Sequence, residues 1–315
     1  MKKVTLVLLI AFTVSLTLWG CGENQTKNEE NKRQDSYNLV FVCPAVNNPY
    51  WQECIRGIRQ ADAELGTTTE ILGPETLDNY KEDLIKSMKR AVGEKPDGIM
   101  GYMGVPGMDK YIKEADNQGI PVVAVDSDAE DTSRTAYVGT DLYRMGYDSG
   151  IKMVELTGGK GKIGYMCTTF DAEGEKKVYQ AFCDAIMDYD MEVVAETEGY
   201  SDIAKAEAAA EKMLEEHPEI TAVFCSGGYN ITGVGNVKKD KGLSELCIIG
   251  MDDVSENIAL VKAGVIDALF VQRTYDMGYQ GVYILKNIID EETMEYSNFD
   301  TGTICVTKEN VNSYK

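Results

Sequence analysis

Two aspartates of this 315-residue chain each end a short apolar run, Asp126 after Val-Ala-Val and Asp252 after Ile-Gly-Met. A carboxylate in that position can accept hydrogen bonds from the hydroxyl or amide groups of a polar ligand. A pair of carboxylates can also catalyse hydrolysis, although nothing in the sequence itself raises the pKa of either group. Calcium binding is a further option, but the spacing of an EF-hand loop is absent. These residues therefore predict binding of a polar ligand, with hydrolysis as the alternative.

A second candidate segment, Asn48-Pro-Tyr50-Trp51, follows the apolar run 39–43 and opens a helical pattern. Its amide can donate and accept hydrogen bonds, and its two rings offer apolar faces. The alternative interpretation is that the rings belong to the core and the asparagine only caps the helix. Because open α/β sheets bind ligands at the carboxyl ends of their strands, this turn is a candidate part of the site.

Other catalytic and cofactor patterns are missing from the sequence. The glycine-rich run 157–162 precedes a strand instead of following one, so it predicts a turn and not a phosphate loop. No G-x-S-x-G motif is present, and the single histidine, His217, lies at the expected end of a helix. Seven of the eight cysteines lie in apolar strand or helix patterns, with no C-x-x-C pair. We therefore expect no metal, no cofactor, no catalytic residue, and thiols that are buried and unpaired.

Strand patterns alternate with helix patterns along most of the chain, which predicts βαβ units and parallel sheets. The order repeats after roughly 125 residues, which indicates two similar lobes whose carboxyl edges face each other across a cleft. The expected strands are 39–43, 68–72, 98–103, 120–125, 135–138, 162–167, 192–198, 222–225, 247–251, 268–272 and 302–306. The expected helices begin at 52 and continue with 77–92, 108–118, 143–156, 176–187, 204–216, 233–239, 254–263 and 275–289.

The N-terminal segment has a different composition from the rest. Two lysines precede an apolar run that ends at Trp19-Gly20-Cys21, which is typical of a secretory signal peptide. Residues 18–21 resemble the bacterial lipobox, in which the cysteine is acylated and becomes the new N-terminus. We expect a signal peptide at 1–20, a lipid on Cys21 and a flexible, lipid-anchored tether at 21–36. A plain secreted protein or a single membrane anchor is the alternative.

The chain is strongly acidic, with a formal net charge of −21 that becomes −23 once the two lysines of the signal peptide are removed. Such a chain is repelled by nucleic acid and by anionic membrane surfaces. We therefore expect no nucleic-acid partner. Attachment to the outer face of the cell membrane would depend on the lipid at Cys21.

Four motifs together resemble the type-I periplasmic sugar-binding proteins: Asn-Asn-Pro-Tyr-Trp51, Gly-Ile-Pro-Val-Val-Ala-Val-Asp126, Ile-Ile-Gly-Met-Asp252 and Phe-Val-Gln272. These are the ribose-, galactose- and xylose-binding receptors of ABC importers, and the resemblance covers nearly all of the chain after residue 37. It implies two α/β lobes, each a parallel sheet flanked by helices, joined by a three-crossing hinge that closes on the ligand. The N-terminal lobe would comprise 37–139 plus 273–301, and the C-terminal lobe 140–272 plus 302–315.

The resemblance also implies which residues bind the ligand. Carboxylates and amides would hold sugar hydroxyls, and rings would stack on sugar C–H faces. The implied set is Asn48, Tyr50, Trp51, Tyr102, Asp126, Asp141, Met251, Asp252 and Gln272. Ser127 and Val178 stand where ribose receptors place arginines, and Tyr102 stands where an asparagine is common. The pocket has thus exchanged guanidinium groups for aromatic area, which argues against a plain ribose site.

The expected function is that of a monomeric lipoprotein without enzymatic activity. It would capture a small neutral solute, a monosaccharide or related sugar, and deliver it to an ABC import permease. Two alternatives remain open. One is a ligand sensor that feeds a membrane histidine kinase or chemoreceptor, and the other is an enzyme that acts on sugars in the cleft.

Overall fold

The computed structural model describes residues 36–76, 79–292 and 297–314. The predicted signal peptide, Cys21 and nearly all of the predicted tether lie outside these residues. Within the described ranges, no helix is both long enough and apolar enough to cross a membrane.

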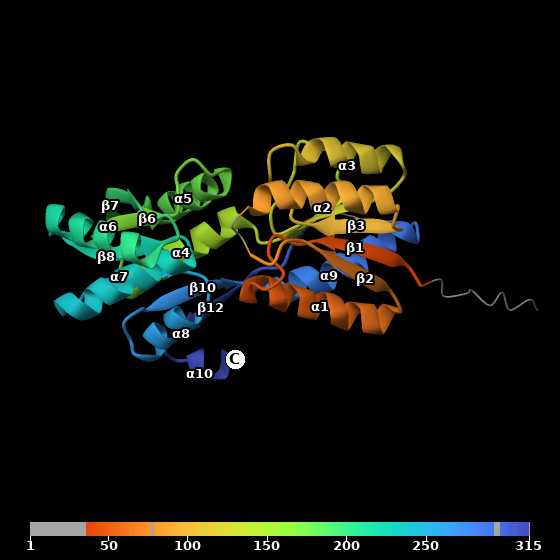
Figure 1. Cartoon of the computed structure of the whole chain (residues 1–315). Coiled ribbons are helices and arrows are strands. Elements are labelled where there is room, and N and C mark those ends of the chain that lie inside the picture. Colours follow the sequence, from red (N-terminus) through yellow and green to blue (C-terminus); the bar gives the residue numbers. More distant parts are fainter. Residues whose placement is uncertain (1–35, 77–78, 293–296, 315) are drawn as a thin grey trace, which may run out of the picture. The chain divides into compact units, whose positions relative to one another are not determined.

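The first sheet has six strands in the order β11-β5-β4-β3-β1-β2, and all neighbours run parallel. They are β1 (Asn38–Val42), β2 (Thr68–Leu72), β3 (Gly98–Gly101), β4 (Val122–Val125), β5 (Ala136–Gly139) and β11 (Asn298–Asp300). Its central strands, such as Val-Val-Ala-Val of β4, are buried along their whole length because helices cover both faces. These helices are α1 (Pro49–Leu65) and α9 (Thr274–Ile289) on one face, and α2 (Tyr80–Glu94) and α3 (Met108–Asn117) on the other (Figure 1).

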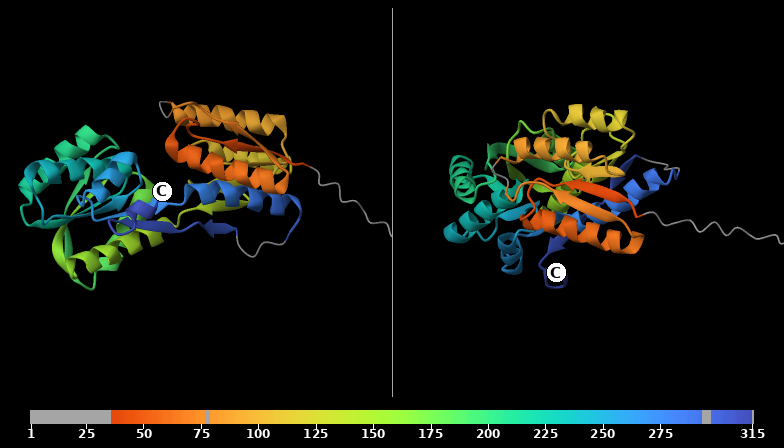
Figure 2. Two further views of the ribbon diagram at one scale, coloured as in Figure 1. Left: turned by 90° about the horizontal axis from the view of Figure 1, so that it is seen from below. Right: turned by 45° about the vertical axis from the view of Figure 1, so that its right-hand side comes forward.

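Helices α1 and α9 lie side by side in Figure 1 and in the left view of Figure 2, although more than 200 residues separate them. Each presents a glycine to the other's backbone. A Cβ at Gly57 would collide with the carbonyl oxygen of Tyr275, and a Cβ at Gly278 would collide with that of Cys54. The two glycines therefore set the close spacing of the pair.

The second sheet has the order β12-β10-β9-β8-β6-β7, with β12 antiparallel to β10 and all other neighbours parallel. Its strands are β6 (Lys160–Cys167), β7 (Asp190–Glu198), β8 (Ile220–Cys225), β9 (Cys247–Met251), β10 (Ala268–Gln272) and β12 (Thr303–Thr307). One face packs against α4 (Leu142–Thr157) and α5 (Glu173–Ile186). The other packs against α6 (Ile203–Glu216), α7 (Gly228–Lys241), α8 (Ser255–Lys262) and the short α10 (Val311–Tyr314).

The chain passes between the two sheets three times. It leaves the first sheet after β5 to form α4, returns after β10 to form α9, and leaves again after β11 to form β12. The last crossing is held to the first, because the backbone N–H of Thr301 donates to the carbonyl oxygen of Gly139 (2.8 Å). Each sheet therefore contains strands from two separate parts of the sequence.

The predicted class, two α/β lobes with mainly parallel sheets and flanking helices, is confirmed. Predictions about several single elements were wrong, among them the start of α5, which lies at Glu173 and not at 176. Helix α7 begins at Gly228, five residues before the predicted start at 233, and Gly227 precedes it as the N-cap residue. The run 157–162 is only partly a turn, since β6 already begins at Lys160. Two strands follow α9 instead of one, because the short, polar Asn-Phe-Asp of β11 pairs with β5.

The seven cysteines within the described residues are free thiols, four of them buried. Burial raises the pKa of each of these thiols, and for Cys43 and Cys247 the pKa reaches about 12. They are therefore protonated at neutral pH and pack as small apolar side chains.

Candidate functional site

Asp126 and Asp252 occupy equivalent positions in the two sheets. Each directly follows a central strand, β4 or β9, and each has a left-handed backbone, with φ of 68° and 69°. Each backbone N–H donates to the neighbouring strand, Asp126 to Val138 (2.9 Å) and Asp252 to Phe270 (3.2 Å). Non-glycine residues with positive φ are uncommon and cluster at ligand sites. The shared conformation places one partly buried carboxylate at the carboxyl end of each sheet.

Asp126 lies among tyrosines. The hydroxyl of Tyr50 donates to its carboxylate, 3.3 Å and 3.2 Å from the two oxygens. The ring of Tyr50 packs edge-on against Trp51, and Trp51 in turn packs edge-on against Tyr102. The hydroxyl of Tyr137 donates to the backbone carbonyl of Asp126 (3.0 Å) and lies 3.3 Å from that of Thr140, at the first crossing. Tyr137 thus connects this half of the site to the hinge.

Asp252 is held by neutral donors. The backbone N–H of Gly228, in the first turn of α7, donates to its Oδ2 (3.0 Å), and the side chain of Gln272 hydrogen-bonds the same carboxylate. Asn257 supports it from behind and donates to the carbonyl oxygens of Asp252 (3.1 Å) and Gly228 (2.9 Å). The side chain of Gln272, at the end of β10, therefore lies beside the carboxylate of Asp252.

The two carboxylates are close enough to influence each other. The pKa of Asp126 is raised to about 7. Burial is the largest cause and the charge of Asp252 adds to it, whereas the hydrogen bond from Tyr50 acts in the opposite direction. Burial also raises the pKa of Asp252, against the hydrogen bonds from Gln272 and Gly228. The sequence contains no sign of these shifts, because they arise from the protein that surrounds the two groups.

Four predicted site residues cap helices or pack in the core. The Oδ1 of Asn48 accepts from the N–H of Tyr50 (2.9 Å) and so caps α1. Trp51 is 5% exposed and packs on Phe41, and Met251 is 5% exposed within the core of the second lobe. Asp141 caps α4 through the N–H of Arg144 (3.0 Å). A role of these four side chains in ligand binding stays a prediction.

Two departures from the ribose-type pattern lie beside each other. Burial raises the pKa of Tyr102 to about 12, and Ser127, at an expected arginine position, is close enough to its hydroxyl to lower that pKa in part. Val178, at the other expected arginine position, is 3% exposed in the core. The structure therefore places no guanidinium at either position.

Sequence reasoning missed Glu175. Its carboxylate accepts a hydrogen bond from Ser226, at the carboxyl end of β8, and one from the backbone of Thr168. Burial raises its pKa and the charge of Asp252 raises it further. The predicted helix began at 176, which left Glu175 in a loop. Its position in the first turn of α5, the helix that follows β6, was the available signal.

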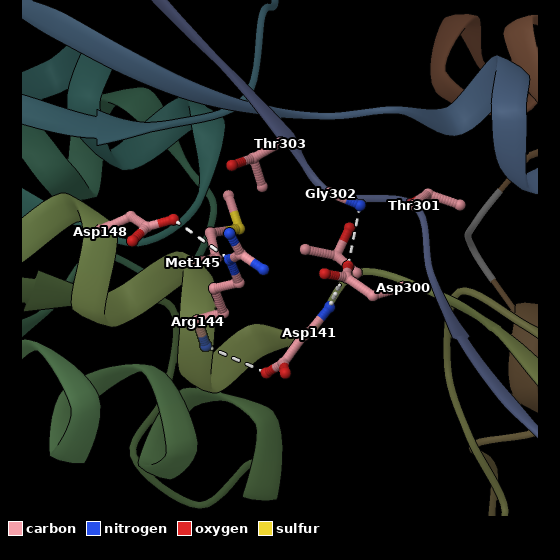
Figure 3. Close-up of a pocket in the computed structure, with 9 residues that line it drawn as sticks. Asp141, Arg144, Met145, Asp148, Asp300, Thr301, Gly302 and Thr303 are labelled. Carbon is pink, nitrogen blue, oxygen red and sulfur yellow. Dashed lines mark hydrogen bonds and ion pairs between the residues drawn. The ribbon is translucent and has the colours of Figure 1, made fainter. Parts of the chain in front are cut away.

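A polar pocket of about 250 Å³ lies at the first and third crossings (Figure 3). The Oδ1 of Asp300 accepts from the N–H groups of Asp141 (3.0 Å) and Gly302 (2.8 Å), and this ties the two crossings together. Arg144 and Asp148 form an exposed ion pair on its rim (3.7 Å). Asp141 therefore lies at the hinge. In the described part of the chain, no group of three or more His, Cys, Asp or Glu side chains could hold a metal ion.

A family model for the periplasmic binding protein domain matches residues 39–293. The chain belongs to the periplasmic binding protein family. The xylose/arabinose-binding protein XylF of Sulfolobus acidocaldarius is 24% identical over 302 residues, which cover 89% of this chain and 73% of XylF. The resemblance to type-I periplasmic sugar-binding proteins is confirmed.

Solved structures of this family superpose on nearly the whole chain. The sugar-binding protein of a Bacillus halodurans sugar ABC transporter is 26% identical with a TM-score of 0.82, covering 89% of this chain and 99% of its own. A XylFII–LytSN complex contains a chain that is 29% identical with a TM-score of 0.75, covering 87% of this chain and 98% of its own. The periplasmic binding protein fold thus extends beyond the matched domain into the C-terminal residues.

The raised pKa of Asp126 predicts a pH-dependent stability of the ligand-free protein. The folded chain binds this proton more tightly than the unfolded chain, whose aspartates titrate near pH 4. The resulting stability is present below about pH 4 and is lost as the pH rises through about 7. Asp126→Asn should therefore be more stable than wild type at pH 8, by on the order of 1–3 kcal/mol, and indistinguishable at pH 4.

Urea denaturation at pH 4, 6 and 8 measures this difference. Tyr50→Phe is the matched control, because it removes the hydrogen bond that lowers the pKa of Asp126 and should steepen the loss of stability. An Asp126→Asn variant with the same pH dependence as wild type would contradict the assignment. A shallower remaining slope is expected from Asp252 and Glu175.

Proposed function

We propose that this protein is an extracytoplasmic solute-binding protein that captures a monosaccharide or related sugar between its two lobes and delivers it to an ABC import permease. The observation that carries the proposal is the pair Asp126 and Asp252. The two acids come from different lobes and share one backbone conformation, and the charge of Asp252 contributes to the raised pKa of Asp126. A ligand that bridges both would favour the closed arrangement of the lobes.

The chemistry of the pair fits sugar hydroxyls. Each carboxylate keeps acceptor capacity beyond the hydrogen bonds described above, and a hydroxyl donates well to a charged acceptor. Tyr50 and Tyr102 are partly buried beside Asp126 and offer ring surface for sugar C–H groups. The named relatives, a xylose/arabinose-binding protein and the sugar-binding protein of an ABC transporter, support a sugar as the ligand and import as the task.

Binding without reaction is part of the proposal. An acid with a pKa near 7 could protonate a leaving group, so the electrostatics alone leave the hydrolase alternative open. Mass spectrometry of the molecule that co-purifies with the protein, before and after long incubation, tests both points. An intact sugar supports the proposal. A sugar that is cleaved during incubation, or a co-purified molecule that is not a sugar, would refute it.

A sensor function is the second candidate, because one relative forms a complex with another protein, LytSN. Import and sensing differ in the membrane protein that recognises the ligand-bound form. Uptake of labelled sugar by cells that lack this protein but express the sugar permease constitutively separates them: import fails, whereas a sensing role leaves uptake unchanged. A histidine kinase gene in the same neighbourhood, without a permease gene, would also favour sensing.

The proposed anchor gives a prediction of its own. Acylation requires the Cys21 thiol, so Cys21→Ala should shift the protein from the membrane fraction to the medium or leave the precursor unprocessed. Cell fractionation and N-terminal mass spectrometry measure this. If wild type is recovered soluble with Gly22 or a later residue as its free N-terminus, the anchor is wrong. Cys305→Ala is the matched control and should stay with the membrane.

A further inference from the structure

Two acidic side chains of the second lobe bind the same turn, 226–228. Ser226 donates to Glu175, and the N–H of Gly228 donates to Asp252. A third acid, Asp126, ends β4 in the first lobe and accepts from the hydroxyl of Tyr50. We call Glu175, Asp252 and Asp126 the carboxylate triad.

The triad has no cationic partner in the described part of the chain. None of its three members forms an ion pair with a lysine, arginine or histidine there. The arginine nearest in sequence to Asp126, Arg134, is bound to Asp128. The lysine next to Glu175, Lys176, pairs with Glu173 at the surface. All donors to the triad described above are neutral: tyrosine, serine, glutamine and backbone N–H groups.

An unpartnered polar group lies in the same place. Tyr165 is fully buried, and its hydroxyl makes no hydrogen bond of good geometry within the described residues, although Ser226 and Glu175 are its polar neighbours. A buried hydroxyl is normally hydrogen-bonded, so this one marks a site with unused capacity beside Glu175. The hydroxyl of Tyr165 is thus an uncharged group next to the acidic cluster that lacks a hydrogen-bond partner among the described residues.

We infer that the ligand carries a protonated amine in addition to hydroxyl groups, so that it belongs to the class of amino sugars. This inference rests on the proposed function and narrows its ligand from the neutral solute that the sequence suggests. Partly buried carboxylates without a counter-ion are stabilised by either protons or a cation. An ammonium group supplies the charge and up to three N–H donors, whereas a neutral sugar supplies donors alone.

The test compares matched sugars on one protein. Calorimetry at pH 7 would use ligand-free full-length protein with D-glucosamine, D-glucose and N-acetyl-D-glucosamine, and with the three galactose counterparts. At least one amino sugar should bind about 10- to 100-fold more tightly than its neutral parent and its uncharged N-acetyl form. Glu175→Gln should lower the affinity for the amino sugar about tenfold and leave that for the neutral parent unchanged.

Glu173→Gln is the matched control, since it makes the same chemical change two residues away on an exposed side chain. It should leave every affinity unchanged. If the neutral parent binds as tightly as the amino sugar in both series, the inference is overturned and the proposed function stands. Equal losses for both sugars in Glu175→Gln would also overturn it, because they would show a merely structural role. If none of the six sugars binds, both the inference and the proposed sugar function fail for hexoses.

Discussion

Asp252→Ala and Asp126→Ala should each lower the affinity for the bound sugar by about 30- to 1,000-fold. Each change leaves sugar hydroxyls unpaired where protein excludes water. It also frees donors that now point at the carboxylate, Gly228 and Gln272 in the case of Asp252, and Tyr50 in the case of Asp126. Calorimetry with the co-purified sugar measures both variants.

The comparison of the two variants tests whether the two lobes close on the sugar. If only Asp126→Ala weakens binding, the ligand rests on the first lobe alone and closure is not the mechanism. His217→Ala is the control, because His217 lies at the end of α6 with its ring against Glu219 (3.2 Å). The His217→Ala variant should bind the sugar with the affinity of wild type. Wild-type affinity in both aspartate variants would place the site elsewhere.

Gly57→Ala should destabilise the protein strongly although it adds a single carbon atom, with a loss of about 3 kcal/mol or more in the free energy of unfolding. The new methyl group would collide with the carbonyl oxygen of Tyr275 and lie 2.9 Å from the backbone nitrogen of Tyr279. Backbone atoms cannot rotate away as a side chain can, so α1 and α9 must separate. Urea denaturation of the ligand-free protein measures the loss.

Gly93→Ala is the matched control, because it makes the same change in α2, where nothing lies within 4 Å of the new atom. It should be neutral or stabilise the protein by up to about 1 kcal/mol, since alanine loses less backbone freedom than glycine in a helix. Similar stabilities of Gly57→Ala and wild type would mean that the two helices are not packed as described.

The sequence predicted the bounds of three strands without error, including the half-exposed edge strand β2, whereas the fully buried β3 and β4 are each two residues shorter than predicted. The bounds of β9 and β10 agree with the prediction, because runs such as Cys-Ile-Ile-Gly-Met and Ala-Leu-Phe-Val-Gln are continuously apolar and end at a polar residue. β11 was missed for the opposite reason. Its Asn-Phe-Asp has no apolar run, and only pairing with the distant β5 makes it a strand.

The sequence showed which residues belong to the candidate site, but it did not show which side chains surround them in the fold. The two aspartates could be located because each ends an apolar run. Burial of their carboxylates, and hence the raised pKa values, depends on residues from other elements. Glu175 and Gly228 were missed for a local reason: both lie in the first turn of a helix whose start was placed too late. An error of a few residues in a helix start thus removed one acid and one backbone donor from the predicted site.

The contact between α1 and α9 also determines when the first lobe can be completed as an exported chain emerges, N-terminus first, on the outer side of the membrane. The core face that β1, β3, β4 and α1 form is closed by Met277, Val282 and Leu285 of α9. These residues follow nearly all of the second lobe in the chain, so they emerge after it. Until then the emerging chain exposes an unfinished apolar face, which is the kind of surface that chaperones bind and that aggregates. The second lobe lacks only its edge strand β12 and the short α10 at that stage, so it can fold before the lobe that precedes it in the sequence.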